Sequence, residues 1–264
     1  MTDALWIELD GAVNVRDLGG LPTAGGQSVR AGRLIRSDNL QDLSERDVRL
    51  LVEQIGVRSV ADLRTGVEVA HEGPGPLTFI DDIDVQNLSL FPESGENTDV
   101  AADVDAPVVL PWQNREETET NDRQGTSAVY LRYLDDRADS IVAALRLIAA
   151  SPGATIVHCA AGKDRTGTVI AVALAEVGVT RDAIVVDYIR SAERIEAIFD
   201  RLRATPTYAH DLDGADADEH APKAATMERL LDAIDRDYGG FPTWLRAHGW
   251  TDDDAAALRG KLLD

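Results

Sequence analysis

Short apolar runs alternate with helical patterns of hydrophobic residues along the first two thirds of the chain. Residues 57–63, 83–90 and 154–158 are runs of the length and composition that form buried strands. Between the strands, residues 44–47 have the form of a capping box that opens a helix, and Gly56 would end that helix. The connections are long enough for crossovers, so the pattern predicts an α/β fold with a mostly parallel central sheet flanked by helices.

Helical patterns fill most of the remaining sequence. Residues 127–150 predict one helix, and the apolar residues 166–177 predict a core helix that ends before a glycine. After residue 180 the pattern is helical almost to the end, apart from the acidic residues 205–222. Residues 93–126 are rich in Asp, Glu, Asn, Pro and Gly and predict a long surface insertion. The chain therefore ends in helices that are not interleaved with strands.

Charge narrows the classes of partner. The formal net charge is -21, from 26 basic and 47 acidic residues, and it repels nucleic acids and anionic membranes. We expect no nucleic-acid partner and no stable membrane insertion, since no apolar run approaches about 20 residues. The first residues lack a basic segment followed by an apolar run, which predicts a cytoplasmic protein. Export without a signal peptide and the oligomeric state are left open.

The chain contains one cysteine, Cys159, so it has no intrachain disulfide and no cysteine-rich zinc site. The acidic segment of residues 205–222 could suggest calcium, but an EF-hand loop counted from Asp211 would need glycine where Asp216 stands. A solvated acidic loop explains this segment better. We expect neither a metal nor a cofactor.

The cysteine begins a distinctive loop: residues 158–167 read His-Cys-Ala-Ala-Gly-Lys-Asp-Arg-Thr-Gly, between a predicted strand and a predicted helix. At such a junction, free backbone N–H groups and the helix dipole bind anions and favour a thiolate. Cys159 is therefore predicted to be a nucleophile, and the planar guanidinium of Arg165 to bind two phosphate oxygens. The remaining residues predicted to bind phosphate are Ala160, Ala161, Gly162, Lys163 and Thr166. The hydroxyl of Thr166 is also placed to donate a hydrogen bond to the sulfur.

Two other loops share parts of this pattern. A nucleotide-binding P-loop needs glycine where Val157 stands and Ser or Thr where Asp164 follows the lysine. A rhodanese-type sulfur carrier would have a shorter loop without the Arg-Thr-Gly exit. Neither fits the sequence as well as a phosphate-binding cysteine loop does.

The loop resembles the signature of the protein tyrosine phosphatase superfamily, and its Gly-Lys-Asp-Arg-Thr-Gly form is similar to the bacterial PtpB-type branch. Residues 14–20, 30–37, 61–64 and 239–263 are similar to that branch as well. This resemblance, which covers nearly the whole chain, implies a phosphatase core with a helical lid over the site. It also implies activity on phosphotyrosine, with phosphoserine, phosphothreonine and phosphoinositides as further substrates.

On this basis we expect a single phosphatase domain. Its core would span about residues 1–190, a helical cap or lid residues 191–225, and C-terminal helices residues 226–264. The reaction would pass through a phosphocysteine without a metal, and the partner would be a phosphorylated protein or a phosphoinositide. The alternative is a catalytically weak phosphate-binding module of the same fold. Residues 93–126, residues 205–222 or both would open and close over the cysteine.

The charged residues of the loop need roles of their own. Because a carboxylate beside an anion site costs electrostatic energy, Asp164 is expected to hold Arg165, to position water or to act as acid or base, unless it only caps the helix. Lys163 would add positive charge at the rim and favour multiply phosphorylated lipid head groups. His158 is expected to order the loop through a hydrogen bond and not to act as the base.

A separate general acid should protonate the leaving oxygen. The family has an aspartate after a Phe-Pro pair, and Glu93 takes that position here. The aspartates of residues 81–84 are the alternatives, together with Asp164 itself. Arg16, Asp17 and Arg64 either support the loop from neighbouring strands or form buried ion pairs without a catalytic role.

Overall fold

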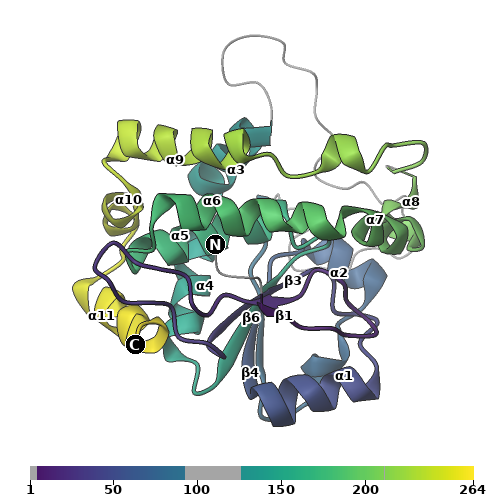
Figure 1. Ribbon diagram of the computed structural model, residues 1–264. Helices are drawn as coiled ribbons and strands as arrows, with labels where there is room; N and C mark the ends of the chain where they lie inside the picture. The colour runs from purple at the N-terminus through teal and green to yellow at the C-terminus, as the bar shows by residue number, and fades with distance from the viewer. Residues whose placement is uncertain (1–4, 93–125, 211) are drawn as a thin grey trace.

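The computed structural model describes residues 5–92, 126–210 and 212–264, and its described part contains one mixed sheet of six strands flanked by helices (Figure 1). The strand order is β1-β2-β3-β6-β4-β5, in which β3, β6, β4 and β5 are parallel and β1 and β2 are antiparallel. The strands are β1 (Leu5–Trp6), β2 (Arg16–Asp17), β3 (Leu34–Ser37), β4 (Val57–Asp62), β5 (Asp84–Asn87) and β6 (Ala154–His158). The predicted α/β fold with a mostly parallel sheet is confirmed.

Helices cover both faces of the sheet. One face packs against the π-helix Leu50–Ile55, which follows α1 (Glu45–Arg49), and the other packs against α4 (Ala138–Ala150) and α5 (Asp164–Glu176). Adjacent strand residues point to opposite faces of the sheet. Ile156 therefore packs on the side of the π-helix, and Val157 packs on the side of α4 and α5. The central strand β6 is therefore buried on both sides, and the loop that follows it starts from a rigid position.

The remaining helices surround the sheet, from the top of the molecule in Figure 1 to the C-terminal helix at its lower left. They are α2 (Gly66–Glu72), α3 (Thr126–Asp136), α6 (Arg181–Ile189), α7 (Ile195–Arg203), α8 (Pro206–Ala209), α9 (Ala224–Tyr238), α10 (Phe241–Ala247) and α11 (Asp252–Leu262), with 3-10 helices Pro76–Phe79, Arg190–Arg194 and Asp218–His220. Helix α9 packs on α3 and α6, and α11 packs on α4. None of the helices within the described ranges is long and apolar enough to cross a membrane.

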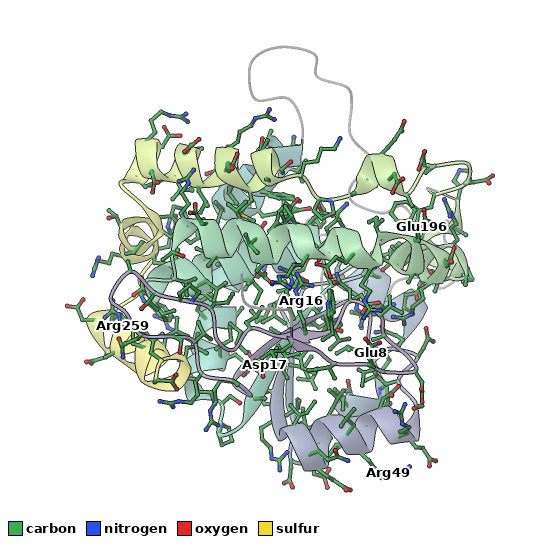
Figure 2. All side chains as sticks on the ribbon, in the orientation of Figure 1. Glu8, Arg16, Asp17, Arg49, Glu196 and Arg259 are labelled. Carbon is green, nitrogen blue, oxygen red and sulfur yellow. The ribbon has the colours of Figure 1, made fainter. Side chains whose placement is uncertain are left out.

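Most charged side chains lie on the surface, with one group of exceptions in the interior. Arg49, Glu196 and Arg259 are exposed, whereas Arg16 is buried beneath α6 (Figure 2). Because a buried charge is costly unless it is paired, such an arginine indicates a structured polar network rather than a solvated surface.

Several local predictions are confirmed. Strand β6 has the predicted bounds, and the capping box predicted at Ser44 is formed. Gly56 ends its helix with a φ of 80°, a conformation that favours glycine. Helix α5 begins at Asp164, two residues before the predicted start, so the helix N-terminus lies inside the cysteine loop.

Other boundaries were wrong. The single helix predicted for residues 127–150 is divided at Arg137, whose φ of -134° is not helical. The side chain of Arg137 donates to the carbonyl of Phe91 and to the hydroxyl of Ser140, and these bonds tie the chain break to the start of α4. Strand β5 is shorter than residues 83–90 because it is an edge strand, and only its middle pairs with β4. Short helices interrupt the predicted loop of residues 205–222, and the predicted insertion of residues 93–126 lies almost wholly outside the described residues.

Candidate active site

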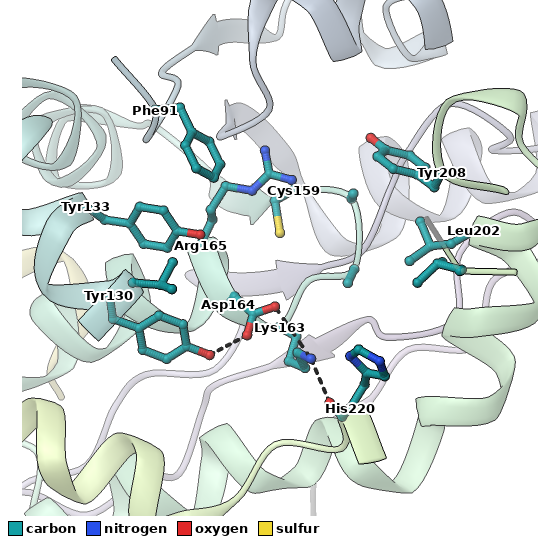
Figure 3. A pocket seen from close by; sticks show the side chains of 14 residues that line it. Phe91, Tyr130, Tyr133, Cys159, Lys163, Asp164, Arg165, Leu202, Tyr208 and His220 are labelled. Carbon is teal, nitrogen blue, oxygen red and sulfur yellow. Dashed lines mark hydrogen bonds and ion pairs between the residues drawn. The ribbon is translucent and has the colours of Figure 1, made fainter. Parts of the chain in front are cut away.

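A cavity of about 520 Å³ lies where the chain leaves β6 for α5 (Figure 3). The sulfur of Cys159 faces this cavity, although the residue is only 2% exposed. The cavity is lined by Phe91, Val129, Tyr130, Tyr133, Cys159, Ala160, Ala161, Lys163, Asp164, Arg165, Leu202, Tyr208, Leu212 and His220. It therefore combines one nucleophilic atom, two cations and mostly aromatic or aliphatic walls.

The carbonyl groups of the cysteine loop are held from behind. The N–H of Asn39 donates to the carbonyl of Ala160 at 3.0 Å, and the side chain of Asn14 donates to residues 161 and 162 at 3.0 and 3.3 Å. Arg36 donates to the carbonyl of residue 162 at 2.7 Å. Among the hydrogen bonds of the described residues, none uses the N–H groups of residues 160–163 as donors. With the carbonyls turned away, these N–H groups can bind an anion in the cavity.

Two features of the backbone make this loop possible. Gly162 has a φ of 66°, and a Cβ there would lie 2.4 Å from the carbonyl oxygen of Ser37, so only glycine fits. Helix α5 begins at Asp164, and no side chain caps its N-terminus within the described structure. The positive end of a 13-residue helix therefore points to the same anion site.

Arg165 is held by Glu68, a residue that the sequence reasoning missed. The two guanidinium nitrogens of Arg165 donate to the two carboxylate oxygens at 2.6 and 2.8 Å. Burial alone would raise the pKa of Glu68, but the charge and hydrogen bonds of Arg165 outweigh it and lower the pKa below its usual range. The guanidinium also lies 5.6 Å from the ring centroid of Phe91. These contacts fix the arginine beside the sulfur.

The carboxylate of Asp164 accepts a hydrogen bond from a tyrosine of another helix. The hydroxyl of Tyr130 donates to one carboxylate oxygen of Asp164, and the hydroxyl of Tyr188 lies 2.8 Å from that of Tyr130. The ammonium of Lys163 lies 3.6 Å from the other carboxylate oxygen of Asp164. Asp164 is thus the one carboxylate among the described residues that line the cavity.

The segment after α7 contacts the loop at two points. Lys163 donates to the carbonyl of His220 at 2.7 Å, so its charge is directed to this segment. The hydroxyl of Tyr208 donates to Glu68 at 2.8 Å, and the tyrosine ring is buried in a small core with Ala160 and Leu202. Part of the predicted lid, residues 205–222, therefore forms one wall of the cavity.

Behind the loop, Arg16 and Arg36 share the carboxylate of Asp187 at 2.8 and 2.5 Å. Arg16 also donates to the side-chain oxygen of Asn14 at 2.7 Å, so it reaches the loop through that residue. Asp17 does not join this network. Its carboxylate accepts the N–H groups of residues 19 and 32 and shapes the turn there.

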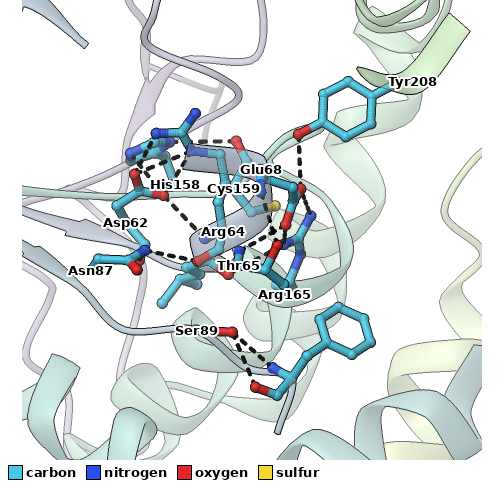
Figure 4. A network of polar contacts seen from close by, with 12 residues as sticks. Asp62, Arg64, Thr65, Glu68, Asn87, Ser89, His158, Cys159, Arg165 and Tyr208 are labelled. Atoms are coloured by element: carbon cyan, nitrogen blue, oxygen red, sulfur yellow. Dashed lines mark hydrogen bonds and ion pairs between the residues drawn. The ribbon is translucent and has the colours of Figure 1, made fainter. Parts of the chain in front are cut away.

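His158 and Arg64 meet at another buried carboxylate, Asp62, which lies beside β6 (Figure 4). Arg64 donates to both oxygens of Asp62, and Nε2 of His158 lies 3.5 Å from the nearer one. Burial lowers the pKa of His158 to about 4, so the ring is neutral at physiological pH. His158 and Arg64 lie behind the cavity and do not line it.

Three further predictions concern the bond from Thr166 to the sulfur and the candidates for the general acid. The hydroxyl of Thr166 is buried and has no hydrogen-bond partner in the described part of the chain, so it forms no bond to the sulfur here. Asp81, Asp82 and Asp84 line a separate hollow at the start of β5, whereas the loop lies at the opposite end of the parallel strands. Glu93 lies outside the described residues.

One missed residue had a signal in the sequence. Thr65 and Glu68 have the spacing of a capping box, and both of its bonds are formed at the start of α2. That pattern predicts a helix start but not the bond to Arg165, which is 97 residues away. Tyr130 and Tyr188 had no local signal, because aromatic residues at helical spacing usually indicate a core.

The fold and the loop bring together a cysteine at the end of a central parallel strand, a glycine turn and a fixed arginine at the next helix start. In a sequence comparison, residues 7–264 match the tyrosine phosphatase family. The chain belongs to this family and is a protein tyrosine phosphatase.

Three relatives extend over most of the chain. The chain is 31% identical to the triple specificity protein phosphatase PtpB of Mycobacterium tuberculosis, covering 97% of this chain and 98% of PtpB. It is 29% identical to a Cupriavidus necator protein with a tyrosine-protein phosphatase name, covering 97% and 88% of the two chains. It is 26% identical to a tyrosine-protein phosphatase of Nostoc commune, covering 91% and 78%.

Proposed function

We propose that the protein hydrolyses phosphate monoesters through a phosphocysteine intermediate on Cys159. The observation that carries this proposal is the convergence of the sulfur, the loop N–H groups and the guanidinium of Arg165 on one cavity. The thiolate attacks phosphorus, the S–P bond forms and the P–O bond to the leaving group breaks. Arg165 and the N–H groups bind the three equatorial oxygens, where negative charge builds up.

In the second step, water attacks the phosphocysteine. A new P–O bond forms, the S–P bond breaks and its electron pair returns to the sulfur as a thiolate. We assign the acceptance of the proton from the attacking water to Asp164, because this carboxylate lines the cavity. Glu93 as donor to the leaving oxygen stays a prediction. No metal is needed in this scheme, since the cysteine and the arginine supply nucleophile and charge.

Phosphotyrosine is the substrate that the cavity walls favour. Phe91, Tyr130 and Tyr133 form one wall and Leu202 and Tyr208 the other, so a phenyl ring would lie between apolar surfaces above the sulfur (Figure 3). We propose phosphoserine, phosphothreonine and phosphoinositides as further substrates, and the triple specificity in the name of one relative supports a range of substrates.

The expected preference of Lys163 for multiply phosphorylated lipid head groups has weaker support. Its ammonium is bound by the carbonyl of His220 and lies close to Asp164, so less of its charge faces the solvent. We propose that a phosphorylated protein is the main partner. We also propose that residues 1–264 act as one phosphatase domain in which residues 191–225 serve as a helical cap or lid.

The replacement Cys159→Ser tests the mechanism. Serine is not ionised at neutral pH, so turnover of 4-nitrophenyl phosphate and of a phosphotyrosine peptide should fall by at least about 10³-fold. Binding of the peptide, measured by calorimetry, should persist because the N–H groups and Arg165 remain. A variant that keeps more than a few per cent of the wild-type rate would refute the phosphocysteine. Activity that a chelator removes and a divalent ion restores would refute the metal-free scheme.

A further inference from the structure

Tyr130 and Tyr188 link Asp164 to the core of the protein. Tyr130 comes from α3, Tyr188 from α6 and Asp164 from the first residue of α5, so three helices meet at two consecutive hydrogen bonds. Both tyrosines are at most 2% exposed, yet Tyr130 also lines the cavity. Figure 3 shows the hydroxyl of Tyr130 directed to the carboxylate of Asp164.

The direction of these bonds follows from the chemistry of the groups. An ionised carboxylate only accepts hydrogen bonds, so the proton of Tyr130 must point to Asp164. The oxygen of Tyr130 is then the acceptor for the proton of Tyr188. Burial and the charge of Asp164 raise the pKa of Tyr130 well above its usual range, which keeps the phenol protonated. The chain of donors therefore runs from Tyr188 through Tyr130 to one oxygen of Asp164.

Packing holds both phenols in place. The rings of Tyr130 and Tyr188 meet edge to face at 6.2 Å, and the rings of Tyr130 and Tyr133 stack at 6.1 Å. Tyr188 also fills the space beside Gly167, where a Cβ would lie 3.0 Å from the tyrosine ring. A carboxylate at the edge of a cavity would otherwise change rotamer freely, but here one of its oxygens is fixed to a rigid donor.

Space filling alone does not explain these residues. Phenylalanine would fill the same volume at both positions without burying two hydroxyl groups, and a buried hydroxyl is costly unless it is bonded. Because the bonds end on the one carboxylate that lines the described cavity wall, the hydroxyl groups act on that carboxylate.

We propose that Tyr130 is a positioning residue for the reaction, and that Tyr188 supports it from the core. Tyr130, supported by Tyr188, holds one oxygen of Asp164, which leaves the other oxygen, beside Lys163, for proton transfer. This inference rests on the proton-transfer role proposed for Asp164.

The test compares single Tyr→Phe variants alone and in an Asp164→Asn background. Tyr130→Phe should lower kcat for a phosphotyrosine peptide about tenfold, since it removes one hydrogen bond to a charged group, and should leave kcat/KM unchanged, because Asp164 acts only after the phosphocysteine has formed. Tyr188→Phe should lower kcat about twofold to threefold, because Tyr130 keeps its own bond to Asp164. With Asp164→Asn already present, Tyr130→Phe should cause no further loss, because positioning has no carboxylate to act on. Tyr238→Phe, at an exposed tyrosine at the end of α9, is the matched control.

Several outcomes would overturn the inference. Tyr130→Phe could leave kcat at the wild-type value, could change only KM, or could lower kcat by the same factor in both backgrounds. Thermal unfolding and vanadate binding show whether each variant is folded, and Tyr188→Phe gives a second test if Tyr130→Phe is unstable. If the wild-type rate depends on Cys159 while Tyr130→Phe is neutral, the positioning role fails and the proposed function stands. If Cys159→Ser stays active, the proposed function itself fails.

Discussion

Two buried arginine–carboxylate clusters lie on opposite sides of the cysteine loop, and they differ in what their arginines face. In one, Arg165 is bound by Glu68 and lines the cavity. In the other, Arg16 and Arg36 share Asp187 and are closed off from the cavity, and Arg36 donates to the back of the loop. The same ion-pair chemistry therefore presents a cation to a ligand on one side and holds the backbone on the other. The arginines of both clusters are buried and paired with a carboxylate. Only access to the cavity distinguishes the arginine that can bind a ligand from the arginines that support the loop.

The largest expected effect is on stability, at the supporting cluster. Asp187→Asn leaves two buried arginines without their common negative charge, so the free energy of unfolding should fall by about 3–5 kcal/mol. The pKa of Asp187 is lowered because its two arginines outweigh the effect of burial. Urea unfolding measures the loss, and kcat of the protein that remains folded should change little.

Asp182→Asn is the control for that experiment, because Asp182 lies on the same helix, α6, but is exposed. This control should keep the wild-type free energy of unfolding. A loss of activity in Asp187→Asn without a loss of stability would show that the supporting cluster acts on catalysis directly, and the distinction between the clusters would be wrong.

The second effect is on activity, at the cavity cluster. Glu68→Gln keeps the capping box, because glutamine is also favoured there, but it removes the charge and one of the two acceptors for Arg165. We expect kcat/KM to fall about 100-fold, as for the loss of one donor to the transition state. Steady-state kinetics with a phosphotyrosine peptide measures this loss.

Tyr208→Phe provides the comparison for that variant. It removes one hydrogen bond to Glu68 and leaves the ion pair with Arg165, so kcat/KM should fall only about fivefold. If kcat/KM falls by the same factor in both variants, the position of Arg165 is controlled by the contact between Tyr208 and Glu68 and not by the charge of Glu68. A wild-type value for Glu68→Gln would show that Arg165 keeps its place without this partner.

The smallest effect concerns pH, at the carboxylate of Asp62, where His158 is buried. The pKa of His158 is about 4 in the folded protein, below its usual value of 6.5. Between these values the unfolded chain binds a proton that the folded chain does not, so stability falls as pH decreases from 6.5 towards 4 and is fully present above 6.5. At pH 5 the free energy of unfolding should be about 2 kcal/mol lower than at pH 7.

His158→Asn should flatten this pH dependence in denaturation experiments between pH 5 and 7. His210→Asn, at an exposed histidine, should leave the slope as in the wild type. An unchanged slope in His158→Asn would mean that another group accounts for the pH dependence of stability in this range.

The sequence predicted the parts of the site that depend on neighbouring residues. The strand, the glycine turn and the helix of residues 154–176 are local, so their residue types were sufficient to place Cys159 between the strand and the helix. The partners of the loop are distant: Glu68 is 97 residues from Arg165, and Tyr130 is 34 residues from Asp164. The position of Glu68 suits a helix start, and that of Tyr130 suits a hydrophobic core. Neither residue type indicates by itself a bond to the cysteine loop. Only the packing of α2 and α3 around the loop shows which polar atoms meet.

The fold predictions failed for a related reason. Apolar periodicity continues through residues 127–150, yet the helix divides at Arg137 because its guanidinium is bound to the carbonyl of Phe91, a long-range contact. Similarly, the spacing of apolar residues does not show whether a strand will be central or at an edge, and β5 is short because it is at an edge.

The walls of the cavity come from residues as far apart as Phe91 and His220, and this has a consequence during synthesis. A chain leaves the ribosome from its N-terminus, so the cysteine and its arginine emerge well before the wall that contains Tyr208 and His220. Until that last wall has emerged and docked, Glu68 lacks one of its hydrogen-bond donors and Lys163 lacks its carbonyl partner. The nascent chain therefore cannot enclose a substrate before residue 220 has been translated.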